Sequence, residues 1–458
     1  MSSTSPNLRD AALPGGPAGE FAEPSFLARR DLTDWLFAAA MVLATAFVFL
    51  RFGSAMDYYE KVILVGAAAA ITATGWGFRP LRLFVVGLAL ISYAGVASYG
   101  GFDGGDLARA DTAFLLKYFL ASQSAILWMC ALFFLATITY WIGIAARSEF
   151  VQRMGSWFTW AATMMGFTGL MLRWYESHQM GEGIGHIPVS NLYEVFVLFS
   201  LITALFYLHY ERRYLVENGG GRALGGFVLL VISSAVGFLL WYSFDRGAHE
   251  IQPLVPALQS WWMKIHVPAN FIGYGTFSLA AMVAYAFLIK QSAETSSPAK
   301  LVPLFLFGVL LGMEPLVFRM NQAVQGGGWV IYVAIGVAAA GALVGFRKRI
   351  AAALPSFEVL DDIMYKAIAV GFAFFTIATI LGALWAADAW GAYWQWDPKE
   401  TWALIVWLNY AAWLHLRLMK GLRGSMPAWW ALIGLLITGF AFLGVNMFLS
   451  GLHSYGQL

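Results

Sequence analysis

Cysteine and charge are both scarce in this 458-residue chain. Its single cysteine, Cys130, cannot form a disulfide within one copy, and it excludes a dithiol relay and a cysteine-based metal site. Cys130 lies in an apolar segment, where we interpret it as a small packing residue. Charged residues make up only 12% of the chain, whereas a soluble domain usually carries about a quarter. The sequence is therefore not that of an ordinary soluble domain.

Long apolar runs fill most of the chain. Hydrophobic residues make up 60% of it. Runs of about 17–25 residues, each long enough to cross a bilayer as a helix, recur from residue 34 to residue 449. The sequence thus predicts an all-α, polytopic transmembrane helical bundle of about 13 spans, at residues 34–52, 61–78, 80–98, 123–146, 157–175, 192–210, 224–243, 266–289, 301–318, 328–346, 364–386, 400–417 and 428–449.

The basic residues predict the orientation of these spans. They gather on alternate loops, which marks those loops as cytoplasmic. Examples are Arg29 with Arg30, Arg147 with Arg153, and Arg347 with its two basic neighbours. The opposite loops are rich in glycine and acids. We therefore expect the N-terminus inside and the C-terminus outside, with residues 1–33 as a disordered cytoplasmic tail rather than a secretory signal.

Histidine is unevenly distributed along the chain. The four spans of residues 34–146 contain none, whereas all seven histidines follow residue 147. We expect residues 34–146 to form a membrane region for packing or partner contact. Residues 147–458 are then expected to form the working membrane domain.

The segment 387–399 is too polar to span a membrane and too aromatic for a simple connector. Four tryptophans and a tyrosine lie in or just before it, and one more tryptophan follows: Trp385, Trp390, Tyr393, Trp394, Trp396 and Trp402. One interpretation is an interfacial aromatic belt. The other is a surface for a flat apolar ligand. Asp397 precedes Pro398 and is placed to cap the helix that follows.

Two histidines lie at predicted outer helix ends. His266 opens span 266–289 and His453 follows the last span. Beside an aromatic surface, two imidazoles suggest axial ligation of a haem iron, although interfacial histidines without a metal are an alternative. Arg173, near the outer end of span 157–175, is a candidate partner for a haem propionate. His415, near the cytoplasmic end of span 400–417, is either a packed residue or a functional one.

Several segments together resemble one known family. "WGAYWQWDPKETWALIVW" is similar to the WWD signature of the haem-handling proteins of cytochrome c biogenesis. "GHIPVSNLYEVFVLFS", "SWWMKIHVPANFIGYGTFSLA", "WLNYAAWLHLR" and "FLGVNMFLSGLHSYG" resemble the CcsA type, also called ResC. The resemblance covers roughly residues 150–458. One departure is the pair of spans at 301–318 and 328–346, which lengthens the distance from His266 to the tryptophans.

The resemblance implies a function and its partners. Such proteins work with a ResB-type partner as a haem exporter and cytochrome c synthase in the bacterial cytoplasmic membrane. They present haem b, bound as substrate, on the outer face, where its vinyl groups join the thiols of a C-x-x-C-H motif in apocytochrome c. The resemblance therefore implies an enzyme of the lyase type, as part of that complex. Membrane lipid is expected around it, and no nucleic acid.

The resemblance also assigns roles to individual residues. It makes His266 and His453 the external axial ligands, and the loop from Trp390 to Asp397 the haem platform. His415 becomes one of two buried ligands, the other being expected from the partner. No catalytic residue apart from the haem ligands is implied. Two other functions stay open: a haem carrier without catalysis, and a generic membrane transporter or structural subunit with the aromatics as a belt.

Overall fold

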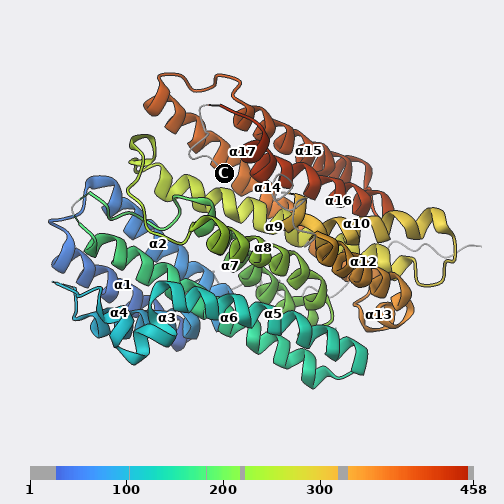
Figure 1. Ribbon diagram of the computed structural model, residues 1–458, viewed down its shortest axis with the longest axis horizontal. Helices are drawn as coiled ribbons and strands as arrows, with labels where there is room; N and C mark the ends of the chain where they lie inside the picture. Colours follow the sequence, from blue (N-terminus) through green and yellow to red (C-terminus); the bar gives the residue numbers. More distant parts are fainter. Residues whose placement is uncertain (1–26, 103, 182, 217–221, 318–328, 452–458) are drawn as a thin grey trace, which may run out of the picture. The chain divides into compact units, whose positions relative to one another are not determined.

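A computed structural model describes residues 27–102, 104–181, 183–216, 222–317 and 329–451. Every regular element within these ranges is a helix. The chain forms two compact units, Met1–Arg82 and Leu83–Leu458. The fold class predicted from the sequence, a polytopic helical membrane bundle, is confirmed (Figure 1).

The first unit contains α1 (Leu32–Phe52) and α2 (Tyr58–Gly77). Each helix begins at an aspartate whose side chain accepts a hydrogen bond from the third helical residue, while the acid at that position returns the bond. The two helices pack against each other. The indole of Trp76 donates to the carbonyl oxygen of Asp34 at 2.9 Å and ties their ends together.

The second unit holds the remaining helices. Its longer elements are α3 (Pro80–Tyr99, which begins at the boundary), α5 (Ser122–Ala146), α6 (Glu149–Gln179), α7 (Leu192–Tyr210), α8 (Leu224–Arg246), α9 (Met263–Gln291), α10 (Pro298–Val317), α12 (Trp329–Gly345), α14 (Phe357–Trp390), α15 (Pro398–Lys420) and α16 (Ser425–Gly439). Shorter elements are α4 (Arg109–Thr112), η1 (Leu116–Leu120), η2 (Glu211–Val216), η3 (Pro256–Leu258), α13 (Arg347–Ala353), η4 (Phe440–Gly444) and α17 (Val445–Phe448).

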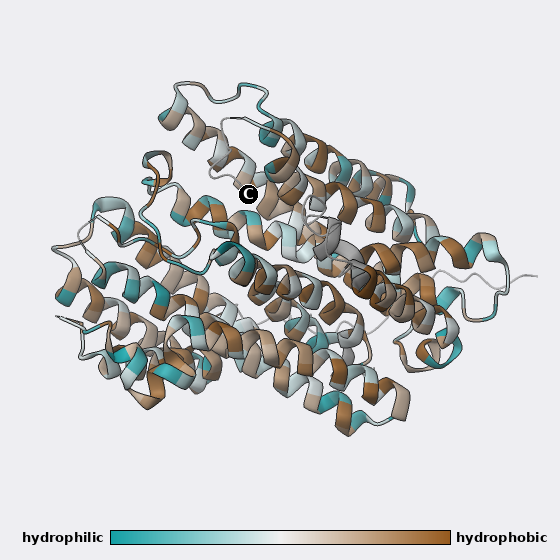
Figure 2. Cartoon of the chain, viewed as in Figure 1, coloured by the Kyte–Doolittle hydropathy of each residue, from teal (hydrophilic) through white to brown (hydrophobic). Residues whose placement is uncertain are grey.

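Each of the 13 predicted spans overlaps a helix of the structure. Within the described ranges, 8 helical segments are long and apolar enough to cross a membrane, and 2 shorter apolar helices accompany them. Figure 2 shows many of the hydrophilic residues at helix ends and in the connecting loops. The number of spans and their orientation stay predictions, because length and hydropathy alone do not decide them.

Helix α9 is the centre of the second unit. It is buried over residues 273–289, and it packs against α7, α8, α14 and α16. At its midpoint, the ring of Phe277 stacks on that of Tyr410 from α15, with centroids 3.6 Å apart. The predicted division of function at residue 147 lies in the short turn between α5 and α6, which pack closely together. That division therefore stays a prediction about function rather than packing.

Candidate functional site

The tryptophan-rich segment is a short loop between α14 and α15, held at both ends by backbone geometry. Gly391 ends α14 in the left-handed conformation, with φ 79°. Asp397 begins α15, and its carboxylate accepts from the backbone N of Lys399 at 3.0 Å. The carboxylate of Glu400 accepts from the backbone N of Asp397 at 3.1 Å in return. The predicted capping role of Asp397 is confirmed.

The inner side of this loop closes a cavity of about 100 Å³, which we call the tryptophan cavity. Its aromatic walls come from the loop and from α14, and His266 of α9 lies in the same lining. The structure thus brings together three residues predicted from the sequence, His266, Trp390 and Trp394. The other lining residues are Asn270, Tyr274, Phe375, Thr379, Gly382, Ala383, Trp385, Tyr393, Lys399, Glu400 and Ala403.

A second cavity of about 220 Å³ adjoins the first, and we call it the asparagine cavity. It is bounded by the first turn of α7, by the first third of α9 and by the start of α17. Three asparagines lie in its wall, together with the residues that it shares with the tryptophan cavity. The asparagines are Asn191, Asn270 and Asn446, and the shared residues are His266, Asn270, Tyr274, Trp385 and Lys399.

The imidazole of His266 is held in a defined orientation between the two cavities. Its Nδ1 lies 2.8 Å from the carbonyl oxygen of Ala378 on α14. A carbonyl oxygen can only accept a hydrogen bond, so Nδ1 carries the hydrogen. Its Nε2 therefore carries the lone pair, and the amide of Asn270 donates to it over 3.3 Å. A histidine that ligates a metal commonly has this arrangement, with the second ring nitrogen bound to a backbone carbonyl.

Two neighbours on α14 shape the pocket for this imidazole. Trp385 lies edge-on to the His266 ring, with centroids 5.6 Å apart, and its indole donates to the carbonyl oxygen of Ala257 at 3.1 Å. Gly382 faces the ring directly, because a Cβ at that position would lie 2.8 Å from Cε1 of His266. A side chain larger than hydrogen at residue 382 would therefore push the imidazole out of place.

Other residues predicted for the site lie elsewhere. Trp396 turns away from the tryptophan cavity, is 68% exposed and adopts a left-handed conformation with φ 57°. Asp397 is buried, lines neither cavity and caps α15. His453 lies outside the described residues.

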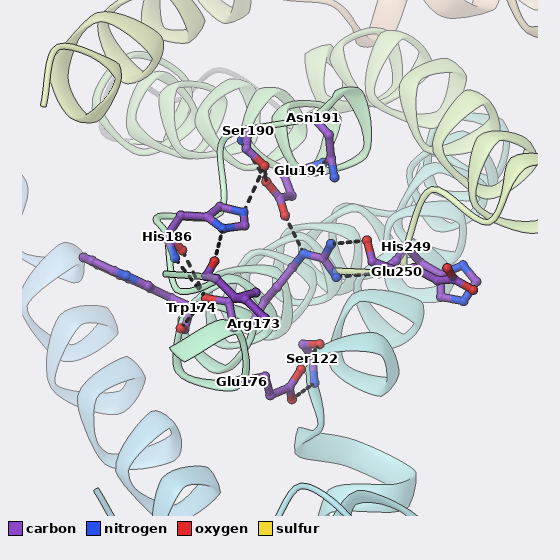
Figure 3. Close-up of polar contacts among 12 residues, drawn as sticks. Ser122, Arg173, Trp174, Glu176, His186, Ser190, Asn191, Glu194, His249 and Glu250 are labelled. Atoms are coloured by element: carbon purple, nitrogen blue, oxygen red, sulfur yellow. Dashed lines mark hydrogen bonds and ion pairs between the residues drawn. The ribbon is translucent and has the colours of Figure 1, made fainter. Parts of the chain in front are cut away.

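Arg173, the predicted propionate partner, has each of its three guanidinium nitrogens hydrogen-bonded inside the protein (Figure 3). Its Nε donates to Glu194 at 2.6 Å, and its two terminal nitrogens donate to the carbonyl oxygens of His249 and Glu250 at 2.6 and 3.1 Å. The side chain is buried and lines neither cavity. The physical reason is that a buried guanidinium requires acceptors, and this one takes them from α7 and the loop after α8.

The arginine network supports the wall of the asparagine cavity (Figure 3). Glu194 accepts from both the backbone N and the hydroxyl of Ser190 at 2.8 Å, and Ser190 lines the cavity. The Nε2 of His186 lies 3.1 Å from the Ser190 hydroxyl, while its Nδ1 lies 2.7 Å from the carbonyl oxygen of Ile184. We interpret His186 as a structural residue of this loop.

His415 differs from the expected buried ligand, since its side chain is exposed on the surface of this chain. The neighbouring Tyr410 and Trp413 face inward, so the helical repeat turns His415 outward. Arg417, two residues closer to the end of α15, pairs through both terminal nitrogens with Asp361, at 3.1 and 2.5 Å. A partner would have to cover His415 for it to become a buried ligand.

The donor set fits haem better than a bare metal ion. Among the residues that the structure describes, no group of three His, Cys, Asp or Glu side chains is arranged for a metal ion. A haem iron needs only axial ligands from the protein, because the porphyrin supplies the other four. One oriented imidazole in an aromatic cavity meets that requirement.

Two charged residues that line these cavities, Lys399 and Glu400, were not identified from the sequence. Lys399 lines both of them, and its Nζ donates to the side-chain oxygen of Asn446 at 2.8 Å. Glu400 is buried in the tryptophan cavity, and its Oε1 has no hydrogen-bond partner among the residues that the structure describes. The charged pair that follows "WDP" could have indicated them, because it opens a helix beside the aromatic segment.

Known proteins match most of this chain. The model of the cytochrome c assembly protein family matches residues 189–453. A cytochrome c biogenesis protein CcsA from Gloeothece citriformis is 34% identical over 330 residues, which are 70% of this chain and 94% of the relative. The proteins of that name from Crocosphaera subtropica and Chlorella vulgaris are 33% and 32% identical, over 74% and 71% of this chain and 98% and 93% of the relatives. The chain therefore belongs to the cytochrome c assembly protein family, in its CcsA-type branch, and is a multi-pass membrane protein of cytochrome c biogenesis.

Proposed function

We propose that this chain presents haem b at the outer face of the bacterial cytoplasmic membrane for attachment to apocytochrome c. The observation that carries the proposal is His266, whose Nδ1 is bound to Ala378 and whose ring lines the tryptophan cavity together with Trp390 and Trp394. In this arrangement the imidazole is an axial ligand and the indoles receive the porphyrin face. His453 is the proposed second axial ligand.

The aromatic lining suits a flat apolar plate. Burying apolar area contributes on the order of 25 cal/mol per Å², and indole rings add offset or edge-on contacts to a π-system. Either cavity alone is smaller than a porphyrin with its side groups. Binding therefore requires the loop to move outward, and Tyr393 and Trp396, both more than 60% exposed, form its mobile outer edge in this proposal.

A third cavity supports passage of an apolar plate through the helices. It has a volume of about 290 Å³ and lies further along α9, where Tyr274 and Phe442 line both it and the asparagine cavity. Its lining is almost entirely apolar. The π-helical turn Phe440–Gly444 forms one wall, and such turns often occur at functional sites.

We infer two stations for the haem. His415 lies about 22 Å below the tryptophan loop at about 1.5 Å per helical residue, too far for one iron to be held at both levels. The inner station uses His415 and a histidine of a ResB-type partner. His415 is exposed on this chain, and a polar imidazole at this depth in the membrane has to be shielded from lipid by another protein. The outer station uses His266 and His453.

At the outer station, attachment proceeds mainly by positioning. The histidine of the C-x-x-C-H motif replaces one axial ligand, which brings the two substrate thiols beside the vinyl groups. This chain has one cysteine and contributes no thiol of its own. The complex with the ResB-type partner is thus the proposed synthase, an enzyme of the lyase type.

Two measurements test this proposal against its alternatives. A bis-histidine haem spectrum should appear when the complex is purified in mild detergent, and a transporter or structural subunit would show none. Co-expression with a ResB-type partner and an apocytochrome c should then yield covalent cytochrome. A haem spectrum without covalent product would indicate a carrier that lacks catalysis.

A further inference from the structure

The two cavities beside His266 differ in charge. Acidic residues are absent from the described lining of the asparagine cavity, whereas Glu400 lies in that of the tryptophan cavity. Lys399 lines both cavities at the boundary between them. It is the one lysine or arginine among their described lining residues. A molecule with a flat apolar part and a carboxylate would therefore place its apolar part against the tryptophans and its carboxylate in the asparagine cavity.

The position of Lys399 is fixed by its neighbours. It is the second residue of α15, and the Asp397 cap and Pro398 hold the backbone there. Its Nζ donates to Oδ1 of Asn446 at 2.8 Å. The Nδ2 of Asn446 donates to the carbonyl oxygen of Phe442 at 2.8 Å, so the amide oxygen is the atom turned toward the lysine. An ammonium has three N–H donors, and Asn446 accepts one.

The neighbouring helix ends also favour an anion here. Ser190, Asn191 and Leu192 form part of the wall, and they begin α7, where the helix dipole is positive. The carboxylate of Glu194 in that first turn is paired with Arg173 at 2.6 Å. Asp397 and Glu400 use their carboxylates to cap α15. Glu194 is therefore paired with Arg173, and Asp397 and Glu400 accept backbone N–H groups at the start of α15, while the Asp397 carboxylate also lies close enough to act on the Lys399 charge.

We propose that Lys399, oriented by Asn446, binds a carboxylate in the asparagine cavity and thereby sets which edge of the haem plate points outward. The proposal rests on the proposed function, since the carboxylate is a haem propionate. It transfers to Lys399 the role that sequence reasoning had given to Arg173. A fixed propionate edge leaves the opposite edge, with the vinyl groups, toward the tryptophan loop.

The experiment compares the binding of haem with that of its dimethyl ester. The full-length protein, purified with its partner and stripped of haem, is titrated with haem and with haem dimethyl ester, which lacks the carboxylates. We expect the wild type to bind haem more tightly than the ester. Lys399→Gln should weaken binding of haem about 10- to 100-fold, as for loss of a hydrogen bond to a charged group, and leave binding of the ester unchanged.

Two further variants provide a second test and a control. Asn446→Asp should weaken haem in the same way, because a new carboxylate occupies the lysine. Lys264→Gln is the matched control: it removes the same charge near His266, from a residue that lines neither cavity, and should change neither affinity.

Each other outcome contradicts the proposal in a distinguishable way. If Lys399→Gln weakens haem and its ester equally, the lysine only supports the fold. If it leaves both unchanged but weakens binding of a C-x-x-C-H peptide, the carboxylate belongs to the peptide. If the wild type binds neither form, the proposed function itself fails.

Discussion

The Nδ1 of His266 lies 2.8 Å from the carbonyl oxygen of Ala378, so the backbone of α14 orients an imidazole carried by α9. This bond joins α9 to α14, the helix that leads into the tryptophan loop. Its Nε2 accepts a long bond from Asn270, at 3.3 Å, which a stronger ligand can replace. The following predictions depend on this arrangement.

Gly382→Ala should impair haem binding without removing any ligand. The added methyl group would lie 2.8 Å from Cε1 of His266 and displace the ring. Overpacking of this kind costs about 1–3 kcal/mol, and we expect haem affinity to fall about tenfold or more. Titration of the stripped complex measures it. Gly66→Ala, where a Cβ meets no atom within 4 Å, is the control. Equal affinity in both variants would contradict the geometry.

Trp394→Ala and Trp396→Ala should differ, although the two residues are separated by a single position. Trp394 lines the cavity with His266, whereas Trp396 is 68% exposed. Loss of one aromatic contact is expected to lower haem affinity about tenfold for Trp394→Ala, with little change for Trp396→Ala. Haem content per purified complex is the measurement. Wild-type occupancy in Trp394→Ala would favour an aromatic belt over a binding surface.

Asp397→Ala should loosen the loop through loss of the helix cap. An N-cap aspartate replaced by alanine costs about 1 kcal/mol of stability, and we expect reduced haem occupancy with intact helices. Asp397→Asn is the matched control, because asparagine caps equally well while removing the charge. Thermal unfolding and haem content would be recorded for both. Equal loss in the two variants would show that the charge, and not the cap, matters.

His415→Ala should empty both stations if haem enters from the cytoplasmic side. His266→Ala should empty only the outer station, and Leu408→Ala, at an exposed position on the same helix, should empty neither. Haem content of each complex with its partner distinguishes these cases. Normal cytochrome maturation by His415→Ala, with its outer haem intact, would return His415 to the role of a surface residue at a helix end.

The helices and the approximate site were predictable because their signals are local. Apolar runs gave the helix positions, the Asp397–Pro398 pair gave the start of α15, and the spacing of aromatics gave the loop. Contacts between helices have no such signal. The carbonyl of Ala378 is 112 residues from His266 in sequence, and no pattern predicts that they meet.

Charged residues were the hardest to assign from the sequence. Arg173 and Lys399 are both predicted near outer helix ends. The difference between them is tertiary: Arg173 meets Glu194 and two carbonyl oxygens, whereas Lys399 meets one amide at the edge of a cavity. His415 shows the same limit, because the rotation of α15 about its axis decides whether the imidazole faces inward.

The most direct test of the account is the absorption spectrum of the purified complex with and without the imidazole of His266. We predict a bis-histidine haem spectrum for the wild type, its loss in His266→Ala together with cytochrome maturation, and partial recovery of both when free imidazole is added. His178→Ala, which alters an exposed histidine outside both cavities, should match the wild type. A bis-histidine spectrum and full maturation in His266→Ala without added imidazole would contradict the assignment of His266 as an axial ligand.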